Sequence, residues 1–527
     1  MRITCLGATR TVTGSCFQVD MNGRDCLLVD CGLFQGGKQT EQRNYATGSY
    51  RVPDLKAILI THAHMDHSGL VPRLVKQGYR GPVYATEATC DLLRILWLDA
   101  AHIQEMEAEW QTRKNKRRGR RQVEPLYETR DAEASARLLK PAQLETEFKP
   151  LPAVRARYVQ AGHILGSASL HLTLSDGEGE HRVGFSGDLG RPGQLIVADP
   201  ERLPPLDTLF METTYGGRRH KSLEDSRSEL LGVIKAAYRD QGKVIIPAFA
   251  VERTQEIIYH LARAHESGDL PADMPVYLDS PLAIKATEVF NRHPELYDQE
   301  ARQVLYQGHN PLDLPSLRCT STSAESQAIN EETGPAVIIA GSGMANAGRI
   351  KHHLKHHLWR PNCHVVIVGF QAEGTLGRRL VEGAKKVNIL GEEVVVKSQV
   401  HTIGGFSAHA DQEELLAWLA PQAHPGLNVH LVHGEENSSL TFQQVAESRF
   451  PQARFDVPRW KEVIALTPAP ALEAAPPVIP DLSARVLRLR QRLIEMEKRL
   501  AAGQGLAGES AVAALERAVA QGESMLG

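Results

Sequence analysis

Up to residue 206 the chain alternates short runs of aliphatic and β-branched residues with turns, and only a few of its segments have helical spacing. Apolar runs of about four to eight residues bounded by turn residues are typical of strands. The pattern predicts strands at 26–32, 57–62, 82–86, 171–174 and 181–188. Apolar positions recur every three to four residues over 68–78 and from Thr89 to about Trp110, which predicts two amphipathic helices.

A second α/β pattern begins at Leu206. Its predicted strands are 208–213, 243–249, 274–281, 336–343 and 364–370, and its predicted helices are 223–242 and 253–268. Strands that alternate with helices of about 12–20 residues favour a parallel sheet covered by helices. Strand-like patterns follow at 387–403 and 427–435.

The end of the chain has a different composition. Residues 464–481 are rich in Pro and Ala and are expected to form an extended, stiff linker. Beyond it, apolar residues keep the a/d spacing of about two heptads at Val486, Leu489, Leu493, Met496 and Leu500. A Gly-rich break at 503–508 precedes a second amphipathic stretch, so we expect a helical hairpin or a small oligomerising module at 482–527.

Length, charge and cysteine content narrow the class of protein. A chain of 527 residues is expected to form two or three domains. The formal charge of −3 gives no general attraction to polyanions, so nucleic-acid contacts must come from local patches. The seven cysteines are scattered and form no CxxC pair, which indicates a reducing compartment. Because the N-terminus lacks a signal-peptide pattern and no run reaches the roughly 18–20 apolar residues of a membrane span, we expect a cytoplasmic protein with no membrane partner.

Four side chains that bind metals are crowded into THAHMDHSG (61–69), directly after an apolar run. They are His62, His64, Asp66 and His67. Neither packing nor helix capping requires four such donors, and the loop at the end of a buried strand is a common place for metal ligands. In an extended segment His62 and His64 can share one ion, whereas Asp66 and His67 begin the next helix and can turn towards a second.

Two more predicted strand ends carry donors among small residues. AGHILGSAS (161–169) contains His163, and FSGDLG (185–190) contains Asp188. One carboxylate can bridge two cations, and the metals of a hydrolytic pair lie about 3.5–4 Å apart. Taken singly, a core histidine and a turn aspartate explain these residues equally well. Following the histidine cluster, they favour one shared metal site.

These motifs, together with LLVDCGLFQGG (27–37), resemble the signature of the metallo-β-lactamase superfamily. The resemblance implies an α/β fold, the αββα sandwich, with metals along one edge of its two sheets. It implies one zinc ion on His62, His64 and His163, a second on Asp66 and His67, and Asp188 as the bridge. Asp30 matches the family's first aspartate, which orients the ligands.

A long insertion points to one branch of the superfamily. Asp188 and His433 are 245 positions apart, far more than small-molecule hydrolases of this fold usually carry. Three stretches resemble motifs A, B and C of the nucleic-acid-processing β-CASP branch: Glu212 in FMETTYGG, His409 in GFSAHADQ and His433 in LVHGE. IPAFAVERTQE (246–256) also resembles that branch, although Glu252 stands where a glycine is expected before Arg253.

The likeness extends from about residue 1 to 463 and is strongest to bacterial proteins akin to the nuclease subunit of the cleavage and polyadenylation specificity factor. It implies a first part of the metallo-β-lactamase domain at 1–206, an inserted β-CASP α/β domain at 207–397 and a second part of the first domain at 398–463. The linker (464–481) and the helical C-terminal tail (482–527) lie outside the common pattern.

The resemblance implies a nuclease with two Zn²⁺ per chain, for which Mn²⁺ is an expected substitute. His433 would complete the second zinc site. Two zinc ions lower the pKa of a shared water, so that a hydroxide can attack a phosphodiester at neutral pH. His409, kept protonated by Glu212, is the expected acid for the leaving oxygen, and Asp188 is expected to be catalytic as the bridging ligand. Products with a 5′ phosphate and a 3′ hydroxyl are implied by the family.

Single-stranded RNA is the expected substrate, cut by endonuclease or 5′ exonuclease action in RNA processing or degradation. The alternatives are a nuclease acting on DNA, a small-molecule hydrolase such as a thioesterase, and an inactive RNA-binding scaffold. The long insertion with Glu212 and His409 disfavours the thioesterase, and the presence of every expected ligand disfavours the scaffold. A homodimer is a further expectation.

Two segments outside the metal motifs are candidates for RNA binding. RKNKRRGRR (113–121) has seven Arg and Lys in nine residues and attracts phosphate, although a solvated loop explains it as well. GSGMANAGR (341–349) combines small residues and backbone amides before a helix, so Ser342 and Arg349 are predicted to contact phosphate.

KHHLKHHL (351–358) raises the question of a third metal site, because its histidines form i,i+4 pairs. A basic helix face with Leu354 and Leu358 directed inward is the favoured interpretation.

Overall fold

The computed structural model describes residues 1–466 apart from 24, 118, 120, 178, 370 and 373. The predicted helical tail, and the predicted linker beyond residue 466, lie outside this part of the chain. Ile464 and Ala465, at the start of that linker, instead belong to the strand Val463–Ala465, which pairs with the N-terminal strand.

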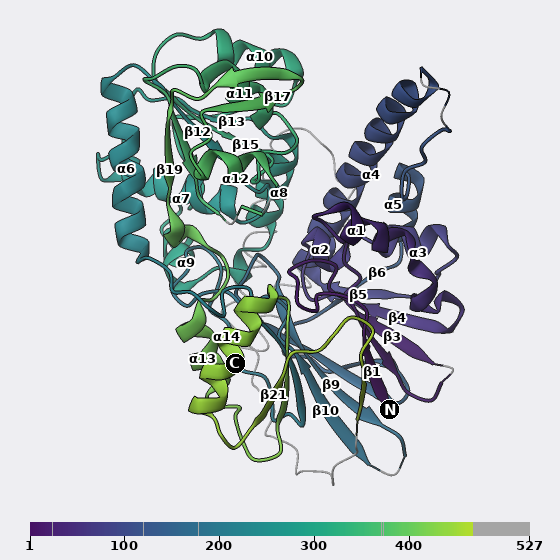
Figure 1. Cartoon of the computed structure of the whole chain (residues 1–527). Helices are drawn as coiled ribbons and strands as arrows, with labels where there is room; N and C mark the ends of the chain where they lie inside the picture. Colours follow the sequence, from purple (N-terminus) through teal and green to yellow (C-terminus); the bar gives the residue numbers. More distant parts are fainter. Residues whose placement is uncertain are drawn as a thin grey trace, which may run out of the picture.

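Two seven-stranded sheets stack face to face in the lower lobe of Figure 1. The first has the order β22 (Val463–Ala465), β1 (Arg2–Cys5), β2 (Phe17–Asp20), β3 (Cys26–Val29), β4 (Leu55–Leu59), β5 (Val83–Thr86), β6 (Leu139–Ala142). The second has the order β21 (Arg454–Asp456), β20 (Asn428–Val432), β11 (Thr208–Glu212), β10 (Glu180–Phe185), β9 (Ala168–Ser175), β8 (Val154–Gln160), β7 (Phe148–Leu151). Buried side chains of both sheets, among them Ile3 and Leu170, form one apolar cluster between them.

Helices cover the outer faces of this pair of sheets. Those on the side of the first sheet are α1 (Lys38–Glu41), α2 (Met65–Ser68), α3 (Val71–Lys76), α4 (Glu87–Lys116) and α5 (Thr129–Ala136). On the second sheet, side chains of α13 (Gln412–Leu419) and α14 (Glu436–Arg449) pack against those of β11 and β20. The expected αββα sandwich is confirmed.

A third sheet forms the core of the upper lobe in Figure 1. Its order is β14 (Leu317–Cys319), β13 (Val276–Leu278), β15 (Ala336–Ala340), β12 (Lys243–Pro247), β16 (His364–Ile367), β19 (Gln399–Thr402), and all neighbours are parallel. The surrounding helices are α6 (Leu223–Arg239), α7 (Arg253–Glu266), α8 (Pro281–Arg292), α9 (Gln299–Tyr306), α10 (Ser323–Glu331), α11 (Ile350–His357) and α12 (Leu376–Val381). The predicted parallel sheet covered by helices is therefore confirmed.

The element boundaries differ from the sequence pattern at several places. The strand-like run 387–403 is divided into the hairpin β17 (Lys386–Ile389) and β18 (Glu392–Val395), followed by β19, because Leu390 and Gly391 adopt positive φ angles of 53° and 89°. The helix predicted at 68–78 is the shorter α3, with Pro72 in its first turn, and Ser68 instead ends the preceding helix α2.

The strand pairing also gives limits of the insertion that differ from the predicted 207–397. Strand β11 belongs to the second sheet of the sandwich, and β19 pairs with β16 in the parallel sheet. The segment inserted between the sandwich strands β11 and β20 therefore starts after Glu212. The parallel sheet within it extends to Thr402, the last residue of β19. The division into domains remains our proposal, with these limits in place of 206/207 and 397/398.

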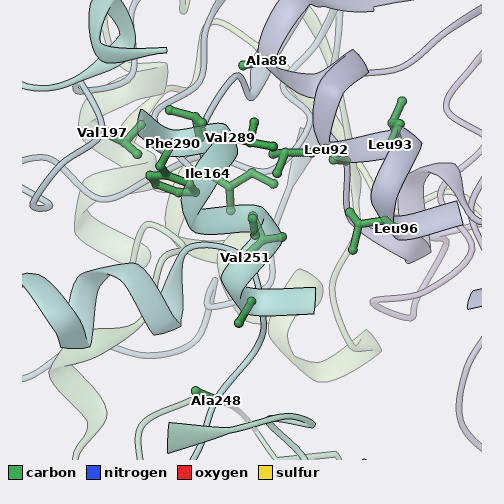
Figure 2. Close-up of a cluster of buried hydrophobic side chains, with 14 of the residues drawn as sticks. Ala88, Leu92, Leu93, Leu96, Ile164, Val197, Ala248, Val251, Val289 and Phe290 are labelled. Carbon is green, nitrogen blue, oxygen red and sulfur yellow. The ribbon is translucent and has the colours of Figure 1, made fainter. Parts of the chain in front are cut away.

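The two lobes meet through a buried apolar cluster, drawn in Figure 2. Thr86 caps the start of helix α4, because its hydroxyl accepts from the Thr89 amide, and the helix packs against α8 of the upper lobe. Leu92 of α4 and Phe290 of α8 are fully buried in this cluster, together with Ile164 from the lower lobe. The loop that carries His163 is thus held in the contact between the lobes.

Candidate metal centre

The THAHMDHSG motif lies where β4 ends at an edge of the sandwich. Leu59 ends the strand, His64 precedes the first turn of α2, and Asp66 and His67 lie within that helix. Gly32, in the loop after β3, packs directly on α2: a Cβ there would lie 1.6 Å from the Asp66 carbonyl oxygen. This close approach requires glycine and fixes α2 against the neighbouring strand.

One group of donors consists of His62, His64, His163 and Asp188, whose ligand atoms all lie within 4.8 Å of one another. His64 Nδ1 is 3.2 Å from both His62 Nε2 and His163 Nε2. Asp188 Oδ2 is 3.5 Å from His62 Nε2 and 3.6 Å from His163 Nε2. A zinc ion with ligands at about 2.0–2.1 Å has tetrahedral edges of about 3.3 Å, so these separations suit one such ion.

A second group consists of Asp66, His67 and His433. The two Nε2 atoms of His67 and His433 are 3.1 Å apart, and Asp66 Oδ2 is 3.6 Å from His433 Nε2. Asp188 faces this group through its other oxygen, because Oδ1 lies 3.3 Å from His67 Nε2. One carboxylate thus stands between two donor sets.

Asp188 also gives a test of whether these residues suit a cation. Its side chain is 2% exposed, and Oδ1 is a buried oxygen with no hydrogen-bond partner among the described residues. A buried carboxylate oxygen without a donor carries a large desolvation cost, which a cation at this position would offset. The donor set of imidazole nitrogens and carboxylate oxygens is of the kind that zinc prefers, so the residues fit a metal site.

Asp30 orients His67 rather than joining either group. His67 Nδ1 donates to Asp30 Oδ2 at 2.7 Å, which leaves Nε2 directed at the second group. Asp30 lies at φ 59°, a conformation that Asp tolerates better than most residues. The predicted role of Asp30 is thus supported by its place behind the ligands.

Thr61 fixes His62 in a similar way. Its backbone amide donates to Asp30 Oδ1 at 2.8 Å and its hydroxyl donates to Asp30 Oδ2 at 2.9 Å. Since the hydroxyl hydrogen is used, the Thr61 oxygen accepts from His62 Nδ1 at 3.1 Å. His62 therefore presents an unprotonated Nε2 to the first group.

Burial keeps the histidines of the first group neutral. It lowers the pKa of His62 and of His163 well below the usual range, and the pKa of His64 to about 4. Burial also opposes the charged form of His67, but the neighbouring Asp188 and Asp30 carboxylates raise its pKa well above the usual range. Neutral imidazoles offer lone pairs to a metal at neutral pH, and a metal in the second group would displace the proton from His67.

His409 and Glu212 stand beside the two groups. Glu212, at the end of β11, is fully buried, and its Oε1 accepts from the Leu189 amide at 2.6 Å. His409 Nδ1 lies 3.3 Å from Glu212 Oε1 and 4.0 Å from Asp188 Oδ2, and its side chain is 22% exposed. Burial opposes protonation of His409, but Glu212 outweighs it and raises the pKa. His409 thus lies between the donor groups and solvent, beside a carboxylate that favours its protonated form. Asp188, Glu212 and His409 also form a third set close enough to share a cation.

Comparison with known proteins agrees with this arrangement. Family models match the chain as a metallo-beta-lactamase superfamily member over residues 9–233, as a Beta-Casp domain over 254–380 and as a Zn-dependent metallo-hydrolase RNA specificity domain over 393–458. Ribonuclease TTHA0252 of Thermus thermophilus is 40% identical over 459 residues, which cover 85% of this chain and 99% of that protein. The chain belongs to the β-CASP branch of the metallo-β-lactamase superfamily.

The chain is also similar to archaeal transcription termination factors. Transcription termination factor FttA of Methanocaldococcus jannaschii is 31% identical over 464 residues, 86% of this chain and 70% of that protein. FttA of Thermococcus kodakarensis is 33% identical over 469 residues, 85% of this chain and 69% of that protein. The family and the donor groups together indicate a metal-binding site.

The predicted substrate residues of the β-CASP insertion lie in its own lobe. The Ser342 hydroxyl accepts from the Ala347 amide at 3.2 Å, within the loop before α11. Arg349 uses its guanidinium internally, since Nη1 donates to Asp279 Oδ1 at 2.6 Å and Nη2 donates to the Ser321 carbonyl at 2.7 Å. Arg349 therefore links this loop to neighbouring segments of the insertion. Because its guanidinium is already hydrogen-bonded there, this arrangement argues against the predicted direct phosphate contact.

The KHHLKHHL helix of the insertion differs from its predicted exposed basic face. Leu354 and Leu358 are fully buried, as expected, but so are His353 and His357. His353 Nε2 donates to Asp279 Oδ2 at 2.7 Å, and both histidines contact the side-chain oxygen of Asn330. Among the described residues, these histidines join no group of three metal donors.

Sequence reasoning missed the hydroxyl residues that hold the ligands. Thr61 directly precedes the first histidine motif, and Thr214 follows Glu212 by two positions. The Thr214 hydroxyl donates to the His433 carbonyl at 3.0 Å and contacts His433 Nδ1 at 3.1 Å. A threonine beside a metal motif was the available signal, but nothing in the sequence says which ligand it contacts.

Proposed function

We propose that this protein is a metal-dependent ribonuclease that hydrolyses phosphodiester bonds of single-stranded RNA with two Zn²⁺ per chain. The observation that carries the proposal is the pair of buried donor groups that share Asp188. The 40% identity to a ribonuclease over nearly its whole length, and the match to an RNA specificity domain, favour RNA over a small-molecule substrate.

In this proposal His62, His64 and His163 hold one ion, Asp66, His67 and His433 hold the other, and Asp188 contacts both. When bound, the two ions would supply a nucleophile derived from water and would neutralise charge on the phosphodiester. Asp30 and Thr61 keep the unprotonated nitrogens of His67 and His62 directed at the ions. Mn²⁺ is the proposed substitute for zinc.

The leaving oxygen needs a proton, and we assign His409 to donate it. His409 is partly exposed and therefore accessible to substrate, and Glu212 behind it stabilises the imidazolium. Loss of the 3′ oxygen in this way leaves a 5′ phosphate and a 3′ hydroxyl. After transfer, Nδ1 still faces Glu212 and the ring can recover its proton from solvent.

RNA binding is proposed at two places outside the metal groups. Arg113, Lys114 and Lys116 lie in the last turn of α4, and all three are exposed. The loop that contains Ser342 supplies small residues and backbone amides at the carboxyl end of β15. None of the described helices has the length and apolar character that crossing a membrane requires. The homodimer and the cytoplasmic location remain predictions.

The test uses end-labelled single-stranded RNA and DNA with the wild type and with Asp188→Ala, each with and without a chelator. We expect cleavage of RNA by the wild type, loss of cleavage on chelation, recovery with added zinc, and no cleavage by the variant. Equal cleavage by both proteins, or cleavage unaffected by the chelator, would refute the metal-site assignment. Preferential cleavage of DNA, or hydrolysis of a thioester without action on RNA, would support the alternative substrates.

A further inference from the structure

Glu252 is a buried carboxyl residue in the loop between β12 and α7 of the upper lobe. It adopts φ 72° and ψ −66°, and 1% of its surface is exposed. The family resemblance leads us to expect glycine here, which has no steric cost at positive φ. A larger side chain at such a position persists when its surroundings hold it in place.

Two groups that donate hydrogen bonds to Glu252 come from the other lobe. Glu252 Oε2 accepts from the Leu165 amide at 3.1 Å, and Oε1 accepts from Gln194 Nε2 at 3.2 Å. Gln194 Nε2 also lies 3.5 Å from the His163 carbonyl oxygen. One carboxyl group of the insertion thus contacts the loop that carries His163 directly at Leu165, and through Gln194 it reaches the His163 carbonyl.

That loop is also held from the start of α4, since the hydroxyls of Thr86 and Thr89 both donate to the Gly166 carbonyl. The amides of His163 and Ile164 both donate to the Ser167 hydroxyl, at 2.9 and 3.2 Å. Figure 2 shows Ile164 and Val251, the residue before Glu252, in the same apolar cluster. Because Leu165 is fully buried, loss of the Glu252 oxygen would leave its amide without this acceptor and away from water.

Among the described residues, no cationic side chain forms a salt bridge with Glu252. The neighbouring Arg253 guanidinium is hydrogen-bonded to the buried Glu256 carboxylate. Burial, with Glu256 adding to it, raises the pKa of Glu252 to about 8. A carboxyl group that is largely neutral at pH 7 has the shape and polarity of a glutamine amide.

We propose that Glu252 is a positioning residue that fixes the 163–165 loop against the β-CASP lobe and thereby holds the His163 imidazole in the metal centre. It acts through Leu165 and Gln194 and does not touch substrate. The inference rests on the proposed function, since it assigns His163 to a metal. It also links the two lobes: a shift of the β12–α7 loop would move a metal ligand.

The test compares Glu252→Gln with Glu252→Met. Both replacements are unbranched and similar in length to Glu, so they share the backbone strain, but only Gln keeps an acceptor for the Leu165 amide. We measure zinc affinity by competition with a chromophoric chelator, and kcat and KM for cleavage of single-stranded RNA. Substitution of groups that support metal ligands typically costs about 10–100-fold in metal affinity or activity.

We expect Glu252→Met to lose about tenfold in affinity for one of two zinc ions and about tenfold in kcat, with KM changed less than twofold. Glu252→Gln should stay within about threefold of the wild type in all three quantities. A Met variant with wild-type zinc affinity and kcat would overturn the proposal, and so would a Gln variant as impaired as the Met variant.

Circular dichroism confirms folding; if the Met variant does not fold, Gln194→Met tests the second contact and should weaken zinc binding without a change in KM. A wild type that binds no zinc and cuts no RNA would instead refute the proposed function.

Discussion

His67 and Asp30 form a 2.7 Å hydrogen bond behind the metal centre, in which His67 Nδ1 donates to the carboxylate. The same carboxylate accepts from the amide and the hydroxyl of Thr61. Asp30 therefore acts as the acceptor in each of these hydrogen bonds. It orients the ligand His67 directly and the ligand His62 through the Thr61 hydroxyl.

We predict that Asp30→Asn weakens zinc binding by about tenfold. Asn tolerates positive φ, so the backbone is retained, but its NH₂ group must face one of the donors that now surround Asp30. The measurement is zinc competition with a chelator, together with activity as zinc is varied. Activity should be low at limiting zinc and largely restored by excess zinc. Unchanged zinc affinity would show that Asp30 does not orient the ligands.

His409→Ala provides a test of the proposed acid. We expect the variant to keep two zinc ions per chain and to lose about 10²–10⁴-fold in kcat, the range typical of a general acid. Zinc content is measured after gel filtration, and cleavage is measured with end-labelled RNA. Loss of zinc from this variant would place His409 among the ligands, as its closeness to Asp188 and Glu212 allows. In that case the assignment of the acid is wrong.

The sequence predicted the donor residues because they follow strands and cluster locally. His62, His64, Asp66 and His67 lie within a single motif, and the resemblance supplied the distant His433. The sequence does not show which distant residues each of these side chains contacts in the folded protein. Nothing in the spacing of the chain indicates that Thr214 contacts the same histidine.

The same reason explains why side chains of the insertion have contacts that the sequence pattern does not indicate. Arg349 resembles a phosphate contact in a glycine-rich loop, yet Asp279, seventy positions earlier, engages its guanidinium. His353 has the spacing of an exposed basic helix face, but it is buried against that same carboxylate. A buried acid changes the role of every basic residue that it contacts, and such contacts between distant segments are not visible in local periodicity.

A pH-dependent stability difference should separate Glu252→Gln from the wild type. Burial raises the pKa of Glu252 to about 8, from an ordinary value of 4.5 in the unfolded chain. Between these values the folded state binds more protons than the unfolded state, so the wild type loses stability as the pH rises. Gln does not ionise, and the variant lacks this loss.

The measurement is the thermal midpoint of both proteins in buffers from about pH 5 to about pH 9. The two midpoints should be close at the lower end, and the variant should become more stable by a few degrees at the upper end. Since both proteins carry the same metal centre, other titrating groups affect them alike. Parallel curves over this range would contradict the raised pKa of Glu252.

The basic end of α4 should contribute to RNA affinity through charge alone. Lys114 and Lys116 are exposed in the last turn of the helix, so they can approach phosphates without losing a buried contact. Each phosphate contact with a single strand contributes about 0.7 to the slope of log K against log salt. Replacing both lysines by Gln should therefore reduce the slope by about 1.4 and weaken binding at low salt.

Fluorescence anisotropy with labelled RNA, in the His409→Ala background to prevent cleavage, measures both effects. The matched control is Lys235→Gln with Arg239→Gln on α6, which lies far from α4 in Figure 1 and should leave the slope unchanged. An equal loss of slope in both double variants would show that total charge governs binding, whereas no loss in either would exclude α4 from the RNA path.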